Sequence, residues 1–177
     1  MKVASILLIA AFGAASATAV AADKISAKDF VKKAGEGGAA EVEMGKLGSA
    51  KATDGDVKAF AQRMVKDHTK ANQELMSVAK AKGFDVFTEP GVMQKGMEEK
   101  FEHQSADKDF NHDYMQHMVK DHEEDVKLFR TASADTTLDP DLRAFAKKTL
   151  PTLEEHLAQA KKLEAKTGKS ERTASEQ

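Results

Sequence analysis

Two stretches of the chain carry the same phrase, Asp54-Gly55-Asp56-Val57-Lys58-Ala59-Phe60-Ala61 and Asp139-Pro140-Asp141-Leu142-Arg143-Ala144-Phe145-Ala146. Asp is a favoured N-cap, proline suits the first helical position, and a second carboxylate stabilises the positive end of the helix dipole. Both stretches are therefore predicted to begin long helices, which continue to about Lys82 and Lys166. The phenylalanine of each phrase is expected to be buried at a matching position.

Apolar residues recur at spacings of three and four in the rest of the chain, which is the period of a helix and not of a strand. The pattern predicts a first helix over about 26–50 and a third long helix over about 108–131. The connection over 84–107 contains Pro90-Gly91 and a short amphipathic piece with Met93, Met97 and Phe101.

The first helix contains many glycines, at positions 35, 37, 38, 45 and 48. Each weakens an isolated helix by about 1 kcal/mol relative to alanine. They are acceptable if a partner helix has to approach closely on this side.

This layout consists of two helical hairpins, 26–82 and 108–166, joined by a long crossover with a short helix. Such a layout is typical of the ferritin-like four-helix bundle. We therefore predict an all-α, ferritin-like domain over residues 23–166 and a disordered polar tail over 167–177. The chain contains no cysteine, but a domain of about 150 residues can fold on its apolar core without disulfides.

The first residues have the three parts of a secretory signal peptide. Lys2 precedes a short apolar core, and small residues lead to an Ala-x-Ala exit in the stretch Ala19-Val20-Ala21-Ala22. We expect residues 1–22 to be removed, and cleavage after Ala21 or Ala22 fits equally well. The alternative is a retained anchor, although a spanning helix needs about 20 apolar residues. Without a cysteine to carry a lipid, the processed chain is expected to be periplasmic or secreted, with no integral membrane insertion.

The charge pattern excludes one class of partner. The chain has 27 basic and 29 acidic residues and a formal net charge of −2. Because the basic residues are spread among acidic ones, we expect no nucleic-acid partner. No phosphate-binding glycine loop, nucleophile elbow or catalytic triad occurs, so a hydrolase or oxidase ranks last among the functions considered. A homo-oligomer and a protein partner both stay open.

A five-residue segment, Met-Val-Lys-Asp-His, occurs twice and ends at His68 and at His122. On a helix of 3.6 residues per turn, both histidines fall on the apolar stripe, as does His156 in the last helix. The first helix offers Glu41 on or beside its own stripe. Each long helix is therefore expected to direct one ionisable side chain towards the core.

Three histidines and a carboxylate that converge in a bundle core would suit zinc, copper or iron. The candidate metal ligands are Glu41, His68, His122 and His156. Carboxylates one position off the apolar stripes are expected to hydrogen-bond to these ligands and orient them. These carboxylates are Asp67, Asp121 and Glu155. The alternative is that each histidine bonds separately to a backbone carbonyl or a neighbouring carboxylate.

Two features argue against parts of this hypothesis. Ferritin-type di-iron centres use a Glu-x-x-His pair on two helices, but the positions three residues before the histidines hold Val65, Val119 and Leu153. If the two repeated openings lie at the same level, His156 lies about 4.5 Å deeper than His68. Pro151 is expected to kink the last helix and change this offset.

The remaining histidines give weaker signals. His117 precedes Asp121 by four positions, so the two are expected to pair on an exposed flank. His103 and His112 are expected to lie in solvent. A copper site from His117 and its neighbours Met115 and Met118 is a further candidate, although such methionines more often fill cores.

Several of these segments together resemble an exported bacterial family of unknown function whose members are often labelled "predicted outer membrane protein". The segments are Gly37-Gly38-x-x-Glu41-Val42-Glu43-Met44-Gly45-Lys46-Leu47, Val57-Lys58-Ala59-Phe60-Ala61, Met64-Val65-x-Asp67-His68, Asp109-Phe110 with Tyr114 and His122, and Leu150-Pro151-x-Leu153-x-x-His156-Leu157. The similarity covers nearly the whole chain after the signal peptide. It implies a ferritin-like four-helix fold and supplies no activity.

The leading hypothesis is a periplasmic ferritin-like binding protein that holds a divalent metal through its core histidines. The alternative is a metal-free structural or stress-protective module that acts through protein partners.

Overall fold

The computed structural model describes residues 24–85 and 87–175, and every regular element within these ranges is an α-helix. The helices are α1 (Ala27–Lys51), α2 (Gly55–Ala81), α3 (Val92–His103), α4 (Lys108–Ala134) and α5 (Pro140–Ser175). The prediction of an all-α chain is therefore confirmed. The expected signal peptide, residues 1–22, lies outside the described residues. In the described ranges, no helix combines the length and the hydropathy needed to cross a membrane.

Side-chain caps define the starts of the long helices. The Asp54 carboxylate accepts hydrogen bonds from two backbone N–H groups in the first turn of α2, and Asp139 does the same for α5. Ser26 and Asp107 cap α1 and α4. After α2 the chain turns at Gly83, whose φ of +74° is rarely adopted by a residue with a side chain. Both repeated openings are thus helix starts, as predicted.

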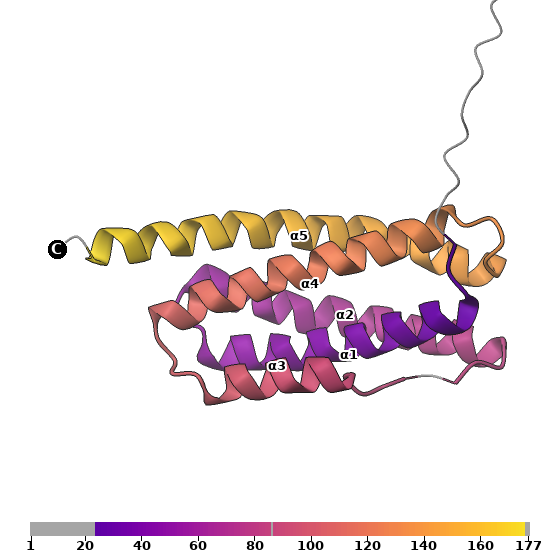
Figure 1. The fold of residues 1–177 in the computed structure, drawn as a ribbon, viewed down its shortest axis with the longest axis horizontal. Coiled ribbons are helices and arrows are strands. Elements are labelled where there is room, and N and C mark those ends of the chain that lie inside the picture. The colour runs from indigo at the N-terminus through magenta and orange to yellow at the C-terminus, as the bar shows by residue number, and fades with distance from the viewer. Residues whose placement is uncertain (1–23, 86, 176–177) are drawn as a thin grey trace, which may run out of the picture.

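The long helices form two hairpins, α1 with α2 and α4 with α5, and these two pairs make the most extensive contacts between elements. Helices α2 and α5 join the hairpins, whereas α1 and α4 pack together only sparsely. Helix α3 lies in the crossover, against the outer side of α1 (Figure 1).

The repeated openings form ion pairs that define how α2 and α5 lie side by side. Lys166, near the end of α5, pairs with both carboxylates of the Asp54 opening at 2.9 and 2.7 Å. Lys82, just after α2, pairs with both carboxylates of the Asp139 opening at 3.2 and 2.6 Å. Helices α2 and α5 are therefore antiparallel, and the two openings lie at opposite ends of the bundle. Ion pairs near the surface add little stability, so these pairs favour one register more than they stabilise the fold.

The core consists of two apolar clusters, one towards each end of the bundle. The first joins the beginnings of α1 and α5 to the ends of α2 and α4, around Phe30, Phe129 and Phe145. The second joins the opposite helix ends, around Phe60, Tyr114 and their neighbours. Phe60 and Phe145 are both buried, as predicted. Their matching positions lie in different clusters because α2 and α5 are antiparallel.

Gly48 in α1 makes room for the aromatic ring of Tyr114 on α4. A Cβ atom at this position would lie 2.5 Å from the Tyr114 Cζ atom and 2.9 Å from the Cβ atom of Ala61 on α2. Both distances are too short for real atoms, so the side chains of two other helices occupy this space. The expected close approach on the glycine-containing side of the first helix is present here.

Residues 167–175 of the expected disordered tail over 167–177 are helical, and residues 176 and 177 lie outside the described residues. Helix α5 continues without interruption through Pro151 and Thr167 to Ser175. Thr167 is buried, its hydroxyl bonds to the Leu163 carbonyl, and the same oxygen lies 3.2 Å from Nδ1 of His112 on α4. Thr167 thus packs against α4, and His112 is partly buried and not fully solvated as expected.

The short helix also differs from expectation at one residue. Phe101 of α3 is buried and Met97 packs against the second cluster, but Met93 is 84% exposed. The predicted apolar side of α3 is therefore correct only for its second half. His103, at the end of α3, is exposed as predicted.

Gly48→Ala is expected to destabilise the protein by about 1–3 kcal/mol, because the added methyl group overlaps the Tyr114 ring. This figure is the net effect, because the steric cost of the overlap is partly offset by a gain of about 1 kcal/mol in helix propensity when glycine is replaced by alanine. Gly96→Ala in α3 is the matched control: no atom lies within 4 Å of the added Cβ, so this change is expected to stabilise. Urea unfolding of both variants measures the difference. A similar gain in both would show that α1 does not approach Tyr114 this closely.

Candidate metal centre

Three histidines from three helices meet in the core: His68 on α2, His122 on α4 and His156 on α5. Their ring centroids lie 5.4–5.6 Å apart. One potential ligand nitrogen from each ring lies within 4.8 Å of the other two. All three side chains are buried. The structure thus brings together the three histidines singled out from the sequence.

The antiparallel register explains why these rings meet. The offset of about 4.5 Å between His68 and His156 assumes that the repeated openings lie at the same level, and they do not. On each of α2, α4 and α5, the histidine lies between residues of the two apolar clusters. Because α2 and α5 run in opposite directions, His68 and His156 lie at the same level, in the middle of the core. We call this level, which contains the three histidines, the histidine layer.

Hydrogen bonds fix the proton position on two of the rings. His122 Nδ1 donates to the Met118 carbonyl at 2.9 Å, and His156 Nε2 donates to Asp67 Oδ2 at 3.0 Å. Both partners are acceptors, so these nitrogens carry the proton in the neutral rings, and the other nitrogen of each ring has a lone pair.

Three of the other four ring nitrogens have no partner within the part of the chain that the structure describes. They are His68 Nε2, His122 Nε2 and His156 Nδ1, all buried. An unsatisfied buried polar group costs about 1–3 kcal/mol. Three such atoms in one layer form a set that one metal ion could satisfy.

Burial favours the neutral form of all three rings. It lowers the pKa of His156 to about 4, and it lowers the pKa of His122. The pKa of His68 falls well below its ordinary value through burial, and the neighbouring rings His122 and His156 lower it further. Neutral imidazole is the form that binds a metal, so at neutral pH all three rings are in the protonation state that metal binding requires.

Asp67 supports His156 and is itself held in place. Arg63 Nε lies 3.1 Å from Asp67 Oδ2, and Arg63 Nη2 lies 2.7 Å from Glu155 Oε2. Asp67 therefore contacts His156 directly, whereas Glu155 contacts Arg63. Arg63 is not among the residues predicted from the sequence, although its spacing of four from Asp67 is typical of an ion pair on one helix face.

Glu41 lies behind His122 and not among the three ligand nitrogens. Its Oε1 atom is 3.6 Å from His122 Nδ1, the nitrogen that bonds to the Met118 carbonyl. The side chain is buried, and among the described residues neither carboxylate oxygen has a hydrogen-bond partner. Burial raises the pKa of Glu41 well above its ordinary value, and the nearby Asp121 raises it further. This position differs from the expected role of Glu41 as a direct ligand.

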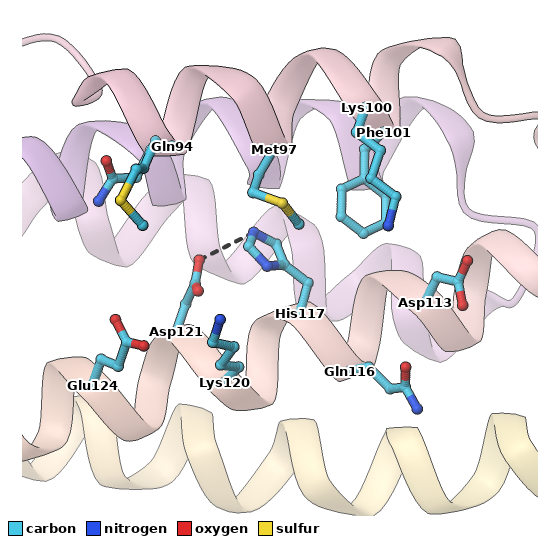
Figure 2. Close-up of a pocket in the computed structure, with 11 residues that line it drawn as sticks. Gln94, Met97, Lys100, Phe101, Asp113, Gln116, His117, Lys120, Asp121 and Glu124 are labelled. Carbon is cyan, nitrogen blue, oxygen red and sulfur yellow. Dashed lines mark ion pairs between the residues drawn. The ribbon is translucent and has the colours of Figure 1, made fainter.

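Asp121 turns away from the three histidines and pairs with His117 at 3.1 Å (Figure 2). The two line a pocket of about 380 Å³ between α3 and α4. His117 is only 9% exposed, so the predicted pair is present but does not lie on an exposed flank. Met115 and Met118 are buried in the core, and Met97 of α3 lies beside the His117 ring instead. The structure therefore does not assemble the suggested Met115–His117–Met118 copper site.

The family model described as "Domain of unknown function (DUF4142)" matches residues 11–163. No significant match is found among curated proteins or among solved structures. The family match contains the three histidines, Asp67 and Glu41. The chain therefore belongs to the DUF4142 family, a domain of unknown function.

Proposed function

We propose that this protein binds one divalent transition-metal ion through His68 Nε2, His122 Nε2 and His156 Nδ1. The observation that carries the proposal is the convergence of three buried, unpartnered imidazole nitrogens from three helices. A tetrahedral ion with bonds of about 2.0–2.1 Å holds its ligand nitrogens about 3.4 Å apart. Side-chain adjustments on the order of 1 Å are enough to reach this separation from within 4.8 Å.

The donor set favours zinc or copper. Imidazole suits zinc, copper, iron and nickel, whereas magnesium and calcium prefer oxygen ligands. Three protein ligands leave a fourth position for water. A di-iron centre of the ferritin type is disfavoured because the chain lacks the Glu-x-x-His pairs.

Two carboxylates are placed to balance the charge of a bound ion. Three neutral imidazoles bring no negative charge, and an uncompensated ion in a buried site is costly. Asp67 lies behind His156 at 3.0 Å, and Glu41 lies behind His122 at 3.6 Å. In this proposal Glu41 is a compensating carboxylate and gives up a proton when the metal binds.

The fold and the location belong to the same proposal. Two hairpins joined by one long crossover, which contains α3, support a ferritin-like bundle. The N-terminal sequence supports export to the periplasm or beyond. A metal-free structural or stress-protective module is the second candidate. Its support is the edge-to-face packing of His122 against His68 and His156, at interplanar angles of 79° and 74°.

Zinc or copper is expected to stabilise metal-free, untagged protein, by about 2.7 kcal/mol when the free ion is at 100 times its dissociation constant. His68→Gln, His122→Gln and His156→Gln are each expected to remove most of this gain, because each removes one ligand. His103→Gln, at an exposed histidine on α3, is the control and is expected to keep the gain. Calorimetry of the five proteins with and without metal provides the test. A metal effect that survives all three core changes would favour the metal-free module.

Asp67→Asn is expected to weaken zinc binding by about 10–100-fold. The amide oxygen still accepts the hydrogen bond from His156, but the negative charge is lost. Glu154→Gln removes a carboxylate from an outward position on α5, where it pairs with Arg130 at 2.6 Å, and is expected to leave affinity unchanged. Competition titrations against a chelator measure both. Equal affinity in the two variants would exclude a supporting role for Asp67.

Zinc affinity is expected to fall by at most about a hundredfold between pH 7.5 and 5.5, because binding releases one proton, that of Glu41. Three imidazoles with the ordinary pKa of about 6.5 would lose about a thousandfold over this range, because protons compete with the metal as the pH falls. Here burial lowers all three values, to about 4 for His156, so competition at the rings begins only at lower pH. Isothermal titration at several pH values decides, and a thousandfold loss by pH 5.5 would show that the ligands are not the buried rings.

A further inference from the structure

A groove of about 580 Å³ follows the seam between α1 and α4, where the two helices pack sparsely. Gly37 on α1 and Asp125 on α4 are among the residues that line it. Gln94 and Glu124 line both this groove and the pocket between α3 and α4, so the two hollows adjoin. Figure 2 shows Asp121 and Glu124 along α4, on the side that faces α3.

Carboxylates lead from this groove towards the histidine layer. Glu124 is exposed, and the next residue, Asp125, is partly buried. A Cβ atom at Gly37 would lie 3.4 Å from Asp125 Oδ1, an ordinary contact distance, so this carboxylate lies directly beside α1 at Gly37. One helical turn further along α1 lies Glu41, because residues four apart share a helix face.

Glu41 is close enough to Asp125 to raise the pKa of that carboxyl, and it also lies beside the His122 ring. Its buried oxygens have no hydrogen-bond partner in the described ranges, and Oε1 lies 3.6 Å from Nδ1 of the His122 ring. The other nitrogen of that ring, Nε2, is one of the three proposed ligand atoms. An unpartnered carboxylate at this point is costly in an apolar core, and a passing cation would be its natural partner.

The opposite side of the bundle is less suited to a cation. The pocket next to Asp67, between α2 and α5, is smaller, about 180 Å³. It is lined by three cationic side chains, Arg63, Lys70 and Lys148, against the two carboxylates Asp67 and Glu74. The α1–α4 groove has four carboxylates, Asp29, Glu36, Glu124 and Asp125, against three lysines. Burial raises the pKa of Asp125 to about 7, so the groove has its full excess of one negative charge only above neutral pH, whereas the pocket beside Asp67 has an excess of positive charge.

We propose that the α1–α4 groove is the route by which a hydrated divalent cation reaches the histidine layer, with Asp125 as the carboxylate that receives it from solvent. The inference rests on the proposed metal binding and adds the path to it. A residue on the path lowers the barrier for uptake and release equally. It therefore changes both rates without changing the affinity.

Stopped-flow mixing with Co²⁺, whose visible absorption reports coordination, tests the route. Asp125→Asn is expected to slow uptake about tenfold, within the 10–10³ range of electrostatic effects on association, and to slow release into excess chelator by the same factor. Gly37→Leu fills the groove floor and is expected to do the same without removing charge. The matched controls are Glu123→Gln, which removes a carboxylate that pairs with Lys161 outside this groove, and Gly96→Leu, at an open position of α3.

The outcomes separate the route from the metal site. Parallel slowing of uptake and release in Asp125→Asn, with an affinity within about twofold of the unchanged protein and normal rates in both controls, supports the route. Normal rates in Asp125→Asn and Gly37→Leu overturn the route and leave the metal site standing. Faster release with normal uptake also overturns it, because Asp125 would then support the bound ion. If the unchanged protein does not bind Co²⁺, both proposals fail.

Discussion

Four ionisable side chains, one from each long helix, lie in one layer of an otherwise apolar core. Glu41, His68, His122 and His156 separate the two aromatic clusters at the ends of the bundle. Burying such groups without full hydrogen bonding costs several kcal/mol, and hydrophobic residues of similar size would avoid that cost. The layer is thus better explained by a ligand than by stability.

The rest of the structure holds this layer in place from two different sides. On the α2–α5 side, Arg63 and Asp67 fix the His156 ring, and the lysine pairs at the helix openings hold the register. On the α1–α4 side, packing is sparse and a groove lined by four carboxylates follows the seam. In the account proposed here, the α2–α5 side provides rigidity and the α1–α4 side provides access.

Much of this architecture follows from local sequence signals. The Asp-x-Asp caps predict two helix starts, and helical periodicity identifies the burial of His68, His122 and His156. The relative direction of α2 and α5 is not a local property, so the sequence leaves open whether their histidines share a level. It also cannot show that Glu41 faces Nδ1 of His122. The side-chain rotamer decides whether this carboxylate is a metal ligand or contacts a ligand, and the sequence does not specify the rotamer. The polar composition of the tail also does not reveal that Thr167 is buried against His112 of α4.

X-ray absorption at the zinc edge, on protein loaded with one equivalent of zinc, tests the central claim most directly. The account predicts three imidazole nitrogens at about 2.0–2.1 Å with one further light ligand, and the multiple-scattering signature of the rings. This pattern should persist in His103→Gln and lose one imidazole in each core histidine variant. A first shell of oxygen ligands without imidazole scattering, or a spectrum unchanged by the core substitutions, would contradict the account.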